Sequence, residues 1–296
     1  MGVVVNTNIP SISASRILSN NRSDLEKAME RLSSGKRINS AKDDAAGMAV
    51  AAKMRADIRS LNQAVRNTND AISLVNTYDG AASEIESILI RMRELAVQAK
   101  NGTYESADRT NADYEYTALK TEVKRIADVT SFNRQLVGTS AAASAGFSFF
   151  VGSDVTKGGN SVAFMGTADG VFTAGSAGLD LNGETAGAGT GSDLKVITNS
   201  DLTAGASGAV VALDGAITKL AARRASAGAL VNRLEHTVAN LMNVSQRLTE
   251  AVSGIEDADY ASESAALARG MVLQQAGTAM LAQANQQPQY ILTLLK

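Results

Sequence analysis

The chain has 296 residues, a formal net charge of −2, no cysteine and only 4% aromatic residues. The lack of cysteine excludes disulfides, thiolate catalysis and cysteine-ligated metals, and the balanced charge gives no general reason to bind nucleic acid or acidic lipid. Because 45% of the residues are hydrophobic but few are aromatic, we expect Ala, Leu, Val and Ile to be buried in narrow seams between helices.

No segment predicts a membrane span or a cleaved leader. No stretch approaches the roughly 18 consecutive apolar residues that a spanning helix requires. The first twenty residues, MGVVVNTNIPSISASRILSN, lack both the basic start and the apolar run of a signal peptide. These features predict a protein that is cytoplasmic, or exported by a route that does not recognise such a signal.

The N-terminal segment predicts a weakly amphipathic helix and then a break. Small and apolar residues recur at steps of four and three over residues 14–32. Gly35 can end this helix. Ser40-Ala-Lys-Asp43 has the form of a capping box, and Asp43 and Asp44 suit the positive end of the next helix. We therefore predict a short spacer between two helices, since the segment lacks the glycine and lysine spacing of a phosphate-binding loop.

Two heptad seams predict two long helices that pack side by side. The first covers residues 58–99, with one phase slip at Tyr78 and a stop at Asn101-Gly102. The second covers residues 213–255 without a slip and stops near Gly254; its 43 residues would span roughly 65 Å. The seam residues expected to carry assembly are Leu61, Val65, Ile72, Ile85, Leu89, Leu220, Val231, Leu234, Val238, Leu241 and Leu248.

The segments between the long helices differ in kind. A shorter seam predicts a helix over residues 106–129, with Ser106 as its N-cap. Residues 138–208 hold 15 of the 25 glycines and five of the six phenylalanines, and short runs such as FSFFVG predict strands divided by glycine turns. Because the flanking helices pair, we expect this insert to lie at one tip of the molecule.

The C-terminal segment resembles the N-terminal one in pattern. GIEDADY, residues 254–260, predicts a second helix stop followed by acidic residues at a new helix start, or a weak cation site. Residues 261–284 are rich in alanine and bury little area, which contributes less than the ~1–2 kcal/mol per residue of lost conformational entropy. Both ends should therefore be marginal alone and become ordered when packed against other copies.

No active site is predicted. His236 is the only histidine and lies beside a helix seam, so we expect it to be solvated or partly buried. GAGTGS, residues 187–192, lacks the third glycine of a dinucleotide-binding motif and predicts a flexible turn. No nucleophilic side chain and general base occur together in a recognised catalytic motif. We expect no enzymatic activity, no cofactor and no metal.

Several long motifs stand in order at the two ends of the chain. The N-terminal half holds ERLSSGKRINSAKDDAAGMAV, RNTNDAISLVNTYDGAASEI and RMRELAVQAKNGTY, and the C-terminal end holds NVSQRLTEAVSGIEDADYASESAALARG and QANQQPQYILTLLK. Together they resemble bacterial flagellin over about residues 3–137 and 210–296. The insert matches nothing recognised, as in the variable outer region of that family.

The predicted fold class is mainly α: a long antiparallel coiled coil or helical rod built from the N- and C-terminal segments, with a small β-rich or irregular insert at one tip. The resemblance implies an inner helical layer, a short spoke and an outer rod. The expected divisions are an inner helix and spoke (1–45), the N-terminal part of the rod (46–137), a surface-exposed insert (138–208), the long rod helix (209–255) and the C-terminal inner helix (256–296). The spoke residues are Ser34, Gly35, Arg37, Asn39, Asp43 and Asp44.

The resemblance also implies the function. It implies a structural subunit that polymerises into the bacterial flagellar filament for swimming motility, located outside the cell after export through the flagellar channel. The implied partners are further copies of the chain, the export apparatus, an export chaperone, and the filament cap and junction proteins, with no nucleic acid and no membrane. The alternatives are a hook–filament junction protein, or a surface adhesin that binds through the insert.

Recognition by the Toll-like receptor that senses flagellin is a further implication. LIRMRELAVQ, residues 89–98, matches the stretch of the family that carries it, with Arg91, Glu94 and Leu95 as the matching positions. Ile90 departs from the polar residue often found there. The sequence leaves the acidic partner on the following helix unplaced. The same stretch is expected to lie at a contact between protofilaments.

Overall fold

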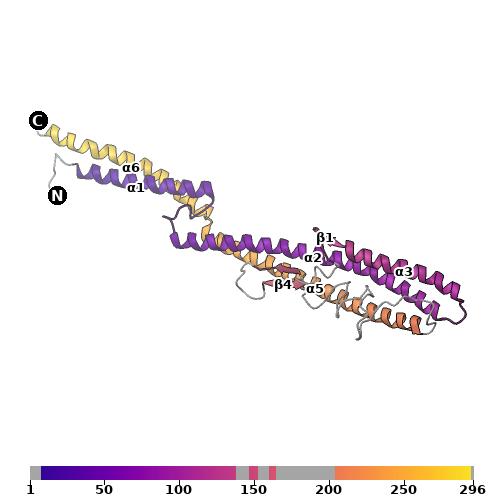
Figure 1. Cartoon of the computed structure of the whole chain (residues 1–296). Coiled ribbons are helices and arrows are strands. Elements are labelled where there is room, and N and C mark those ends of the chain that lie inside the picture. The colour runs from indigo at the N-terminus through magenta and orange to yellow at the C-terminus, as the bar shows by residue number, and fades with distance from the viewer. Residues whose placement is uncertain (1–7, 138–146, 153–159, 165–203, 295–296) are drawn as a thin grey trace. The chain divides into compact units, whose positions relative to one another are not determined.

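A computed structural model of the chain describes residues 8–137, 147–152, 160–164 and 204–294. In these ranges the fold is mainly α, with two small antiparallel sheets, as predicted (Figure 1). The elements are α1 (Ile9–Ser34), α2 (Ala45–Lys100), α3 (Ser106–Val129), β1 (Ser131–Phe132), β2 (Gln135–Leu136), β3 (Phe147–Phe150), β4 (Ser161–Phe164), α5 (Ala204–Glu256) and α6 (Tyr260–Leu294). None of the described helices is long and apolar enough to cross a bilayer.

The chain divides into two compact units. The terminal unit comprises residues 1–58 and 246–296, and the central unit comprises residues 59–245. In the terminal unit α1 and α6 run antiparallel along one another (Figure 1). Asn8 Nδ2 donates to the Ala284 carbonyl oxygen at 2.8 Å near one end of the pair.

Local signals in the sequence define α1. Asn8 is the N-cap, and its Oδ1 accepts a hydrogen bond from the Ser11 backbone N–H at 3.1 Å. Pro10 lies in the first turn, where its missing N–H costs nothing. Gly35 ends the helix in the left-handed conformation with φ 70°, as predicted, and its N–H donates to the Arg31 carbonyl oxygen at 2.8 Å.

The capping box predicted at Ser40–Asp43 is wrong, because α2 begins two residues beyond Asp43. The N-cap is Asp44, whose Oδ1 accepts from the Gly47 N–H at 2.8 Å. Asp43 instead closes a separate turn, in which its carboxylate accepts from the Ser40 N–H at 3.0 Å. The hydrogen bonds from the backbone and side chain of Ser40, and then that from the Asn39 N–H, lower the pKa of Asp43.

The two long helices form the scaffold of the central unit, and they pack antiparallel as predicted. Arg224 on α5 donates from Nε to Asp79 Oδ1 on α2 at 2.8 Å, and Ser245 Oγ donates to Asn62 Oδ1 at 3.1 Å. Their fully buried core side chains include Tyr78, Ile85, Leu89, Met92, Leu213, Leu220 and Leu234. The phase slip at Tyr78 lies where α2 also packs on the insert, since the Tyr78 ring meets Phe164 of β4 edge-on at 5.5 Å.

Some helix ends differ from the prediction. The helix α2 ends at Lys100 before Asn101-Gly102, as predicted. However, α5 continues two residues past Gly254 to Glu256, because a glycine inside a packed helix costs only about 1 kcal/mol. The N-cap of α3 is Glu105 rather than Ser106, and the Glu105 N–H donates to Asp108 Oδ2 at 3.4 Å.

The described strands of the insert do not lie at a tip of the helix pair, which corrects that prediction for β3 and β4. Asn67 Nδ2 on α2 donates to the Phe150 carbonyl oxygen at 3.3 Å, roughly 50 Å along the helix from Lys100 at about 1.5 Å per residue. The reason is the direction of α3, which folds back along α2 and buries Tyr116 and Val123. It returns the chain to the middle of α2 before the insert begins.

Alkaline pH is expected to destabilise the central unit. Burial raises the pKa of Tyr78 from 10.0 to about 12 and also raises the pKa of Tyr116. A raised folded-state pKa means that the stabilising contribution is complete below pH 10 and is lost as the pH rises through 12. Thermal unfolding of the full chain, followed by circular dichroism, should show a lower midpoint at pH 11.5 than at pH 9, and the fall should be smaller in Tyr78→Phe. An equal fall in Tyr78→Phe would contradict the assignment to Tyr78.

Candidate functional site

The predicted assembly seam lies inside the chain. Leu61, Ile85 and Leu89 on α2 are buried. Leu220, Leu234 and Leu241 on α5 are also buried. The remaining seam residues are partly buried: Val65, Ile72, Val231, Val238 and Leu248. These side chains therefore hold the helices of one chain together. Their role in assembly stays a prediction, and they would affect assembly by stabilising the folded chain.

The two breaks in the helices lie side by side in the terminal unit. The Arg37 N–H donates to the Glu256 carbonyl oxygen at 2.7 Å, and the Ala258 N–H donates to the Gly35 carbonyl oxygen at 3.0 Å. Lys36 and Asp257 form the β-bridge between these bonds. The spacer at residues 35–44 is thus paired by its backbone with residues 256–258.

Side chains complete the spacer. Ser34 Oγ accepts from the Lys36 N–H at 3.1 Å and from Asn39 Nδ2 at 2.8 Å. Asp259 plays the same part at α6 as Asp44 at α2, since its Oδ1 accepts from the Ala261 N–H at 3.0 Å. The prediction that GIEDADY repeats a helix stop and an acidic restart is confirmed. Across the described ranges, no group of three His, Cys, Asp or Glu side chains could hold a metal ion.

Glu256 is a residue whose importance the sequence did not indicate. It is only 6% exposed, and its carboxylate pairs with Arg55 Nη1 at 3.1 Å and with Lys36 Nζ at 3.8 Å. It therefore connects the end of α5, the spacer and the first turns of α2 within the terminal unit. Its position eight residues after the seam residue Leu248 places it near the same face of the helix, which is the signal in the sequence that could have found it.

Two of the three residues of the expected receptor contact, Arg91 and Glu94, are exposed. Arg91 donates from Nε to Glu115 Oε1 at 2.9 Å and from Nη1 to Glu94 Oε2 at 3.0 Å. The acidic side chain of α3 that pairs with Arg91 is Glu115. Leu95 is 2% exposed, so only Arg91 and Glu94 of the three predicted residues present side chains to a partner.

Large apolar side chains are exposed along α1 and α6. Only Leu25 and Ala28 of α1 are fully buried. The exposed apolar side chains are Ile9, Ile12, Ile17 and Met29 on α1 and Tyr260, Met271, Val272, Leu273 and Met280 on α6. We call this set the terminal apolar surface. Exposed apolar area marks candidate sites of protein association, so we take this set as the candidate association surface.

Two glycines allow α1 and α6 to approach closely. A Cβ placed at Gly270 would lie 3.3 Å from Leu25 Cδ1, and one at Gly277 would lie 3.2 Å from Leu18 Cδ1. The spacing of seven residues on both helices places each glycine opposite a leucine, as in a heptad seam. The small residues that limit the apolar area buried between α1 and α6 therefore also allow the two helices to approach closely.

Gly270→Leu is expected to loosen the pairing of α1 with α6. The added side chain has no space beside Leu25, and overpacking costs roughly 1–3 kcal/mol, against a gain of about 1 kcal/mol in helix propensity. Limited proteolysis of the full chain should cut residues 260–286 several-fold faster. Gly228→Leu is the control, because no atom lies within 4 Å of a Cβ there. Equal cutting of both variants would contradict the close approach.

Known proteins match this chain along most of its length. A family model described as the bacterial flagellin N-terminal helical region matches residues 5–137, and one described as the bacterial flagellin C-terminal helical region matches residues 210–295. A flagellin of Halalkalibacterium halodurans is 41% identical over 300 residues, covering 99% of this chain and 100% of the relative. A flagellin of Bacillus subtilis is 40% identical over 308 residues, covering 99% of each chain.

Two further matches complete the comparison. The flagellar filament 33 kDa core protein of Treponema phagedenis is 37% identical over 303 residues, covering 99% of this chain and 100% of the relative. A crystal structure of Bacillus cereus flagellin is 32% identical, covers 60% of this chain and 88% of that chain, and superposes with a TM-score of 0.45.

Proposed function

This chain belongs to the bacterial flagellin family and is a structural subunit of the flagellar filament, and from that premise we propose that its copies polymerise through α1 and α6. The observation that supports this proposal is the terminal apolar surface. Burying apolar area at about 25 cal/mol per Å² is the main driving force of association. The contact between α1 and α6 is close but buries few side chains, so most of that apolar area is left available to other copies.

This proposal assigns each segment of the chain to a layer of the filament. Residues 1–45 and 256–296 would form the inner layer of the filament, residues 46–137 and 209–255 the outer rod, and residues 138–208 the exposed insert. The backbone pairing of the spacer with residues 256–258 supports a rigid spoke between the two layers. The boundaries between the two units lie near Ile58 and Gln246. Each is 10 or more residues away, along the chain, from the proposed spoke.

We further propose the partners and the route that the family implies. The chain would be exported unfolded through the flagellar channel without a cleavable signal peptide, escorted by an export chaperone. It would then meet the filament cap and junction proteins outside the cell. The sparse burial in α1 and α6 supports this route, because ends with so little buried area are stabilised mainly by partners.

Receptor recognition is proposed for Arg91 and Glu94 only. Both side chains are at least half exposed, but Arg91 is already paired with Glu94 and Glu115, so a receptor would have to replace or extend these ion pairs. Leu95 would contribute through packing inside the chain. Arg91→Ala should weaken activation of the flagellin-sensing Toll-like receptor by the monomer, and an unchanged response would place the contact elsewhere.

The alternatives are not favoured by the comparisons. A hook–filament junction protein would form short rings, and an adhesin would bind through the insert. The family matches cover both helical ends, and curated relatives along nearly the whole chain are flagellins. The adhesin alternative requires a binding site in the insert, residues 138–208. Residues 165–203 of that insert lie outside the described residues.

Electron microscopy of seeded assembly tests the proposal. Purified protein is monomerised by heat and seeded with filament fragments, beside a variant lacking residues 1–31 and 261–296. We expect long tubes from the full chain and none from the truncated chain. Rings or caps from the full chain would favour the junction protein, and tubes from the truncated chain would show that α1 and α6 are not the assembly elements.

The insert should be dispensable for assembly only in part. From the sequence we expect that much of 138–208 can be deleted without loss of polymerisation. The strands at 147–164 should be kept, because Val151, Val162 and Phe164 pack on buried side chains of α2 and α5. Deleting 165–203 with a short linker should leave polymerisation intact. Deleting 138–208 should lower the unfolding temperature by exposing Tyr78 and Leu234. Filament loss on deletion of 165–203 alone would show that this segment carries an essential contact.

A further inference from the structure

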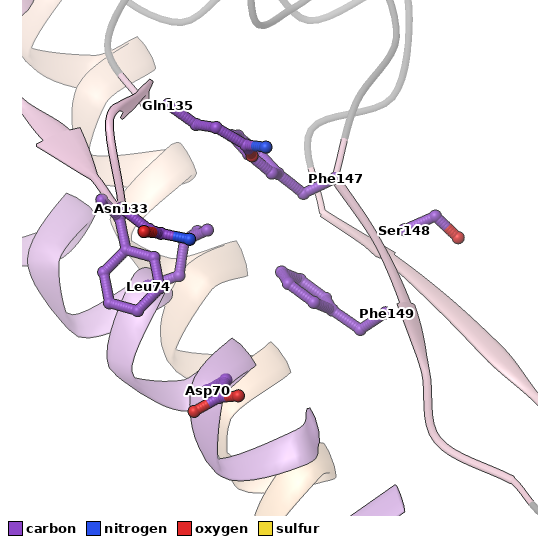
Figure 2. A pocket seen from close by; sticks show the side chains of 8 residues that line it. Asp70, Leu74, Asn133, Gln135, Phe147, Ser148 and Phe149 are labelled. Carbon is purple, nitrogen blue, oxygen red and sulfur yellow. The ribbon is translucent and has the colours of Figure 1, made fainter. Parts of the chain in front are cut away.

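A pocket of about 460 Å³ lies in the central unit between α2, the β1–β2 hairpin and β3. Figure 2 shows it from close by. Its lining residues are Asp70, Leu74, Phe132, Asn133, Gln135, Phe147, Ser148 and Phe149. None of these residues belongs to the seams, the spacer or the terminal apolar surface. The pocket is therefore separate from the residues to which assembly is assigned above.

Aromatic rings form one side of this pocket. Phe147 and Phe149 stand two residues apart on β3 and therefore share a face of the strand. Their rings are parallel within 8°, with centroids 6.5 Å apart. Both extend from β3 toward α2, whereas the Ser148 hydroxyl extends away (Figure 2) and bonds with the Ser161 hydroxyl at 2.6 Å. Phe132 adds a third ring from the β1–β2 hairpin.

An exposed carboxylate stands on the α2 side of the pocket. Asp70 lies below the Phe149 ring in Figure 2 and is exposed. Among the described residues it has no ion pair and no hydrogen bond, and the arginine one turn earlier, Arg66, donates to Gln63 instead. A negative charge near three phenyl rings, with no cation paired to it among the residues that the structure describes, is the distinguishing feature of the site.

We propose that this pocket binds an organic cation, an alkylammonium group of the size of choline. The face of a phenyl ring attracts a cation within about 6 Å of its centroid, and alkylammonium groups are the ligands that clusters of aromatic rings favour. Asp70 supplies the compensating charge. An uncharged apolar ligand would displace water from the carboxylate without supplying a charge or a hydrogen bond in its place, and this desolvation is costly.

The polar residues at the rim give the site its orientation. Asn133 is held at φ 50° in the turn of the β1–β2 hairpin, and Asn133 and Gln135 bring amide groups to the pocket. These amides can bond to a hydroxyl or carbonyl attached to the cation. Amides and aromatic rings also suit a neutral sugar. The carboxylate of Asp70, which no described cation neutralises, is what favours the charged ligand.

Methyl NMR of the full chain tests the proposal. The Leu74 methyl groups line the pocket and report occupancy directly. Choline chloride should shift them saturably at a dissociation constant on the order of millimolar, at an ionic strength held constant with sodium chloride. The neutral analogue 3,3-dimethylbutan-1-ol, which has the same shape, should bind at least about fivefold more weakly. Equal binding of choline and the alcohol, or shifts with glucose and none with choline, would overturn the proposal.

Two variants assign the binding to the pocket. Asp70→Asn changes an exposed side chain and should weaken choline binding roughly fivefold or more without changing alcohol binding. Phe147→Leu keeps an apolar side chain, though a smaller one, and removes one aromatic ring; it should also weaken choline binding. Asp24→Asn is the matched control, since Asp24 is exposed on α1 in the other unit. Unchanged affinity in Asp70→Asn would refute recognition of the charge.

Discussion

Leu234→Asp is expected to unfold the central unit and to abolish filaments. Leu234 is 0% exposed and packs against Ala71 on α2 and against Val151 and Val162 of the insert. Removing the leucine side chain costs about 3–5 kcal/mol, and burying a carboxylate without a partner adds several more. The total approaches the whole stability of an ordinary domain.

The measurement separates folding from assembly. Thermal unfolding of the full chain by circular dichroism should show loss of the cooperative transition in Leu234→Asp, and seeded electron microscopy should show no tubes. Asn232→Asp is the matched control, because Asn232 is exposed two residues away on the same helix; it should melt and assemble normally. Leu234→Met should cost less than about 1.5 kcal/mol. Normal tubes from Leu234→Asp would show that the seam is assigned wrongly.

Arg55→Met is expected to release the pairing between the two helix breaks. The buried member of the ion cluster is the carboxylate of Glu256, whose side chain is 8% exposed, whereas Arg55 is 42% exposed. Removing Arg55 leaves that carboxylate with only the more distant Lys36 at 3.8 Å. An undercompensated buried charge costs about 2–3 kcal/mol. Glu256→Gln should cost less than about 1 kcal/mol, because the freed cations can turn to water.

Hydrogen exchange of the full chain provides a local measurement. The amides of Arg37 and Ala258 bridge the two breaks, so Arg55→Met should reduce their protection by roughly 30- to 160-fold. The double variant with Glu256→Gln should recover part of that loss. Lys53→Met is the control, since Lys53 is exposed on the same helix. A greater effect of Glu256→Gln than of Arg55→Met would contradict the assignment of Glu256 as the buried partner.

The helices were predictable because their signals are local. The heptad seams placed α2 and α5, Gly35 marked the end of α1, and Asn101-Gly102 marked the end of α2. The errors fall at caps, where several neighbouring residues are chemically able to serve. Asp44 replaced Ser40 and Glu105 replaced Ser106 because packing decides which of the candidates meets the free N–H groups.

The contacts of the candidate site were not predictable in the same way. Glu115 as the partner of Arg91, Glu256 as the partner of Arg55, and the insert strands beside the middle of α2 each join residues far apart in the chain. Nothing in the periodicity of one segment states which turn of another segment it will meet. The direction in which α3 returns along α2 sets the place of the insert and the walls of the aromatic pocket.

The sequence by itself determined that this protein is a set of long amphipathic helices with two matched breaks, and its motifs identified the family. Helix periodicity and helix stops depend on residues within about one turn of one another, so they can be recognised in the amino-acid sequence alone. Only the tertiary structure decided which seam residues are sealed inside the chain, which apolar residues of α1 and α6 remain exposed, and which carboxylate is buried. Burial and ion pairing depend on which segments meet in space, and that is settled by packing the whole chain at once.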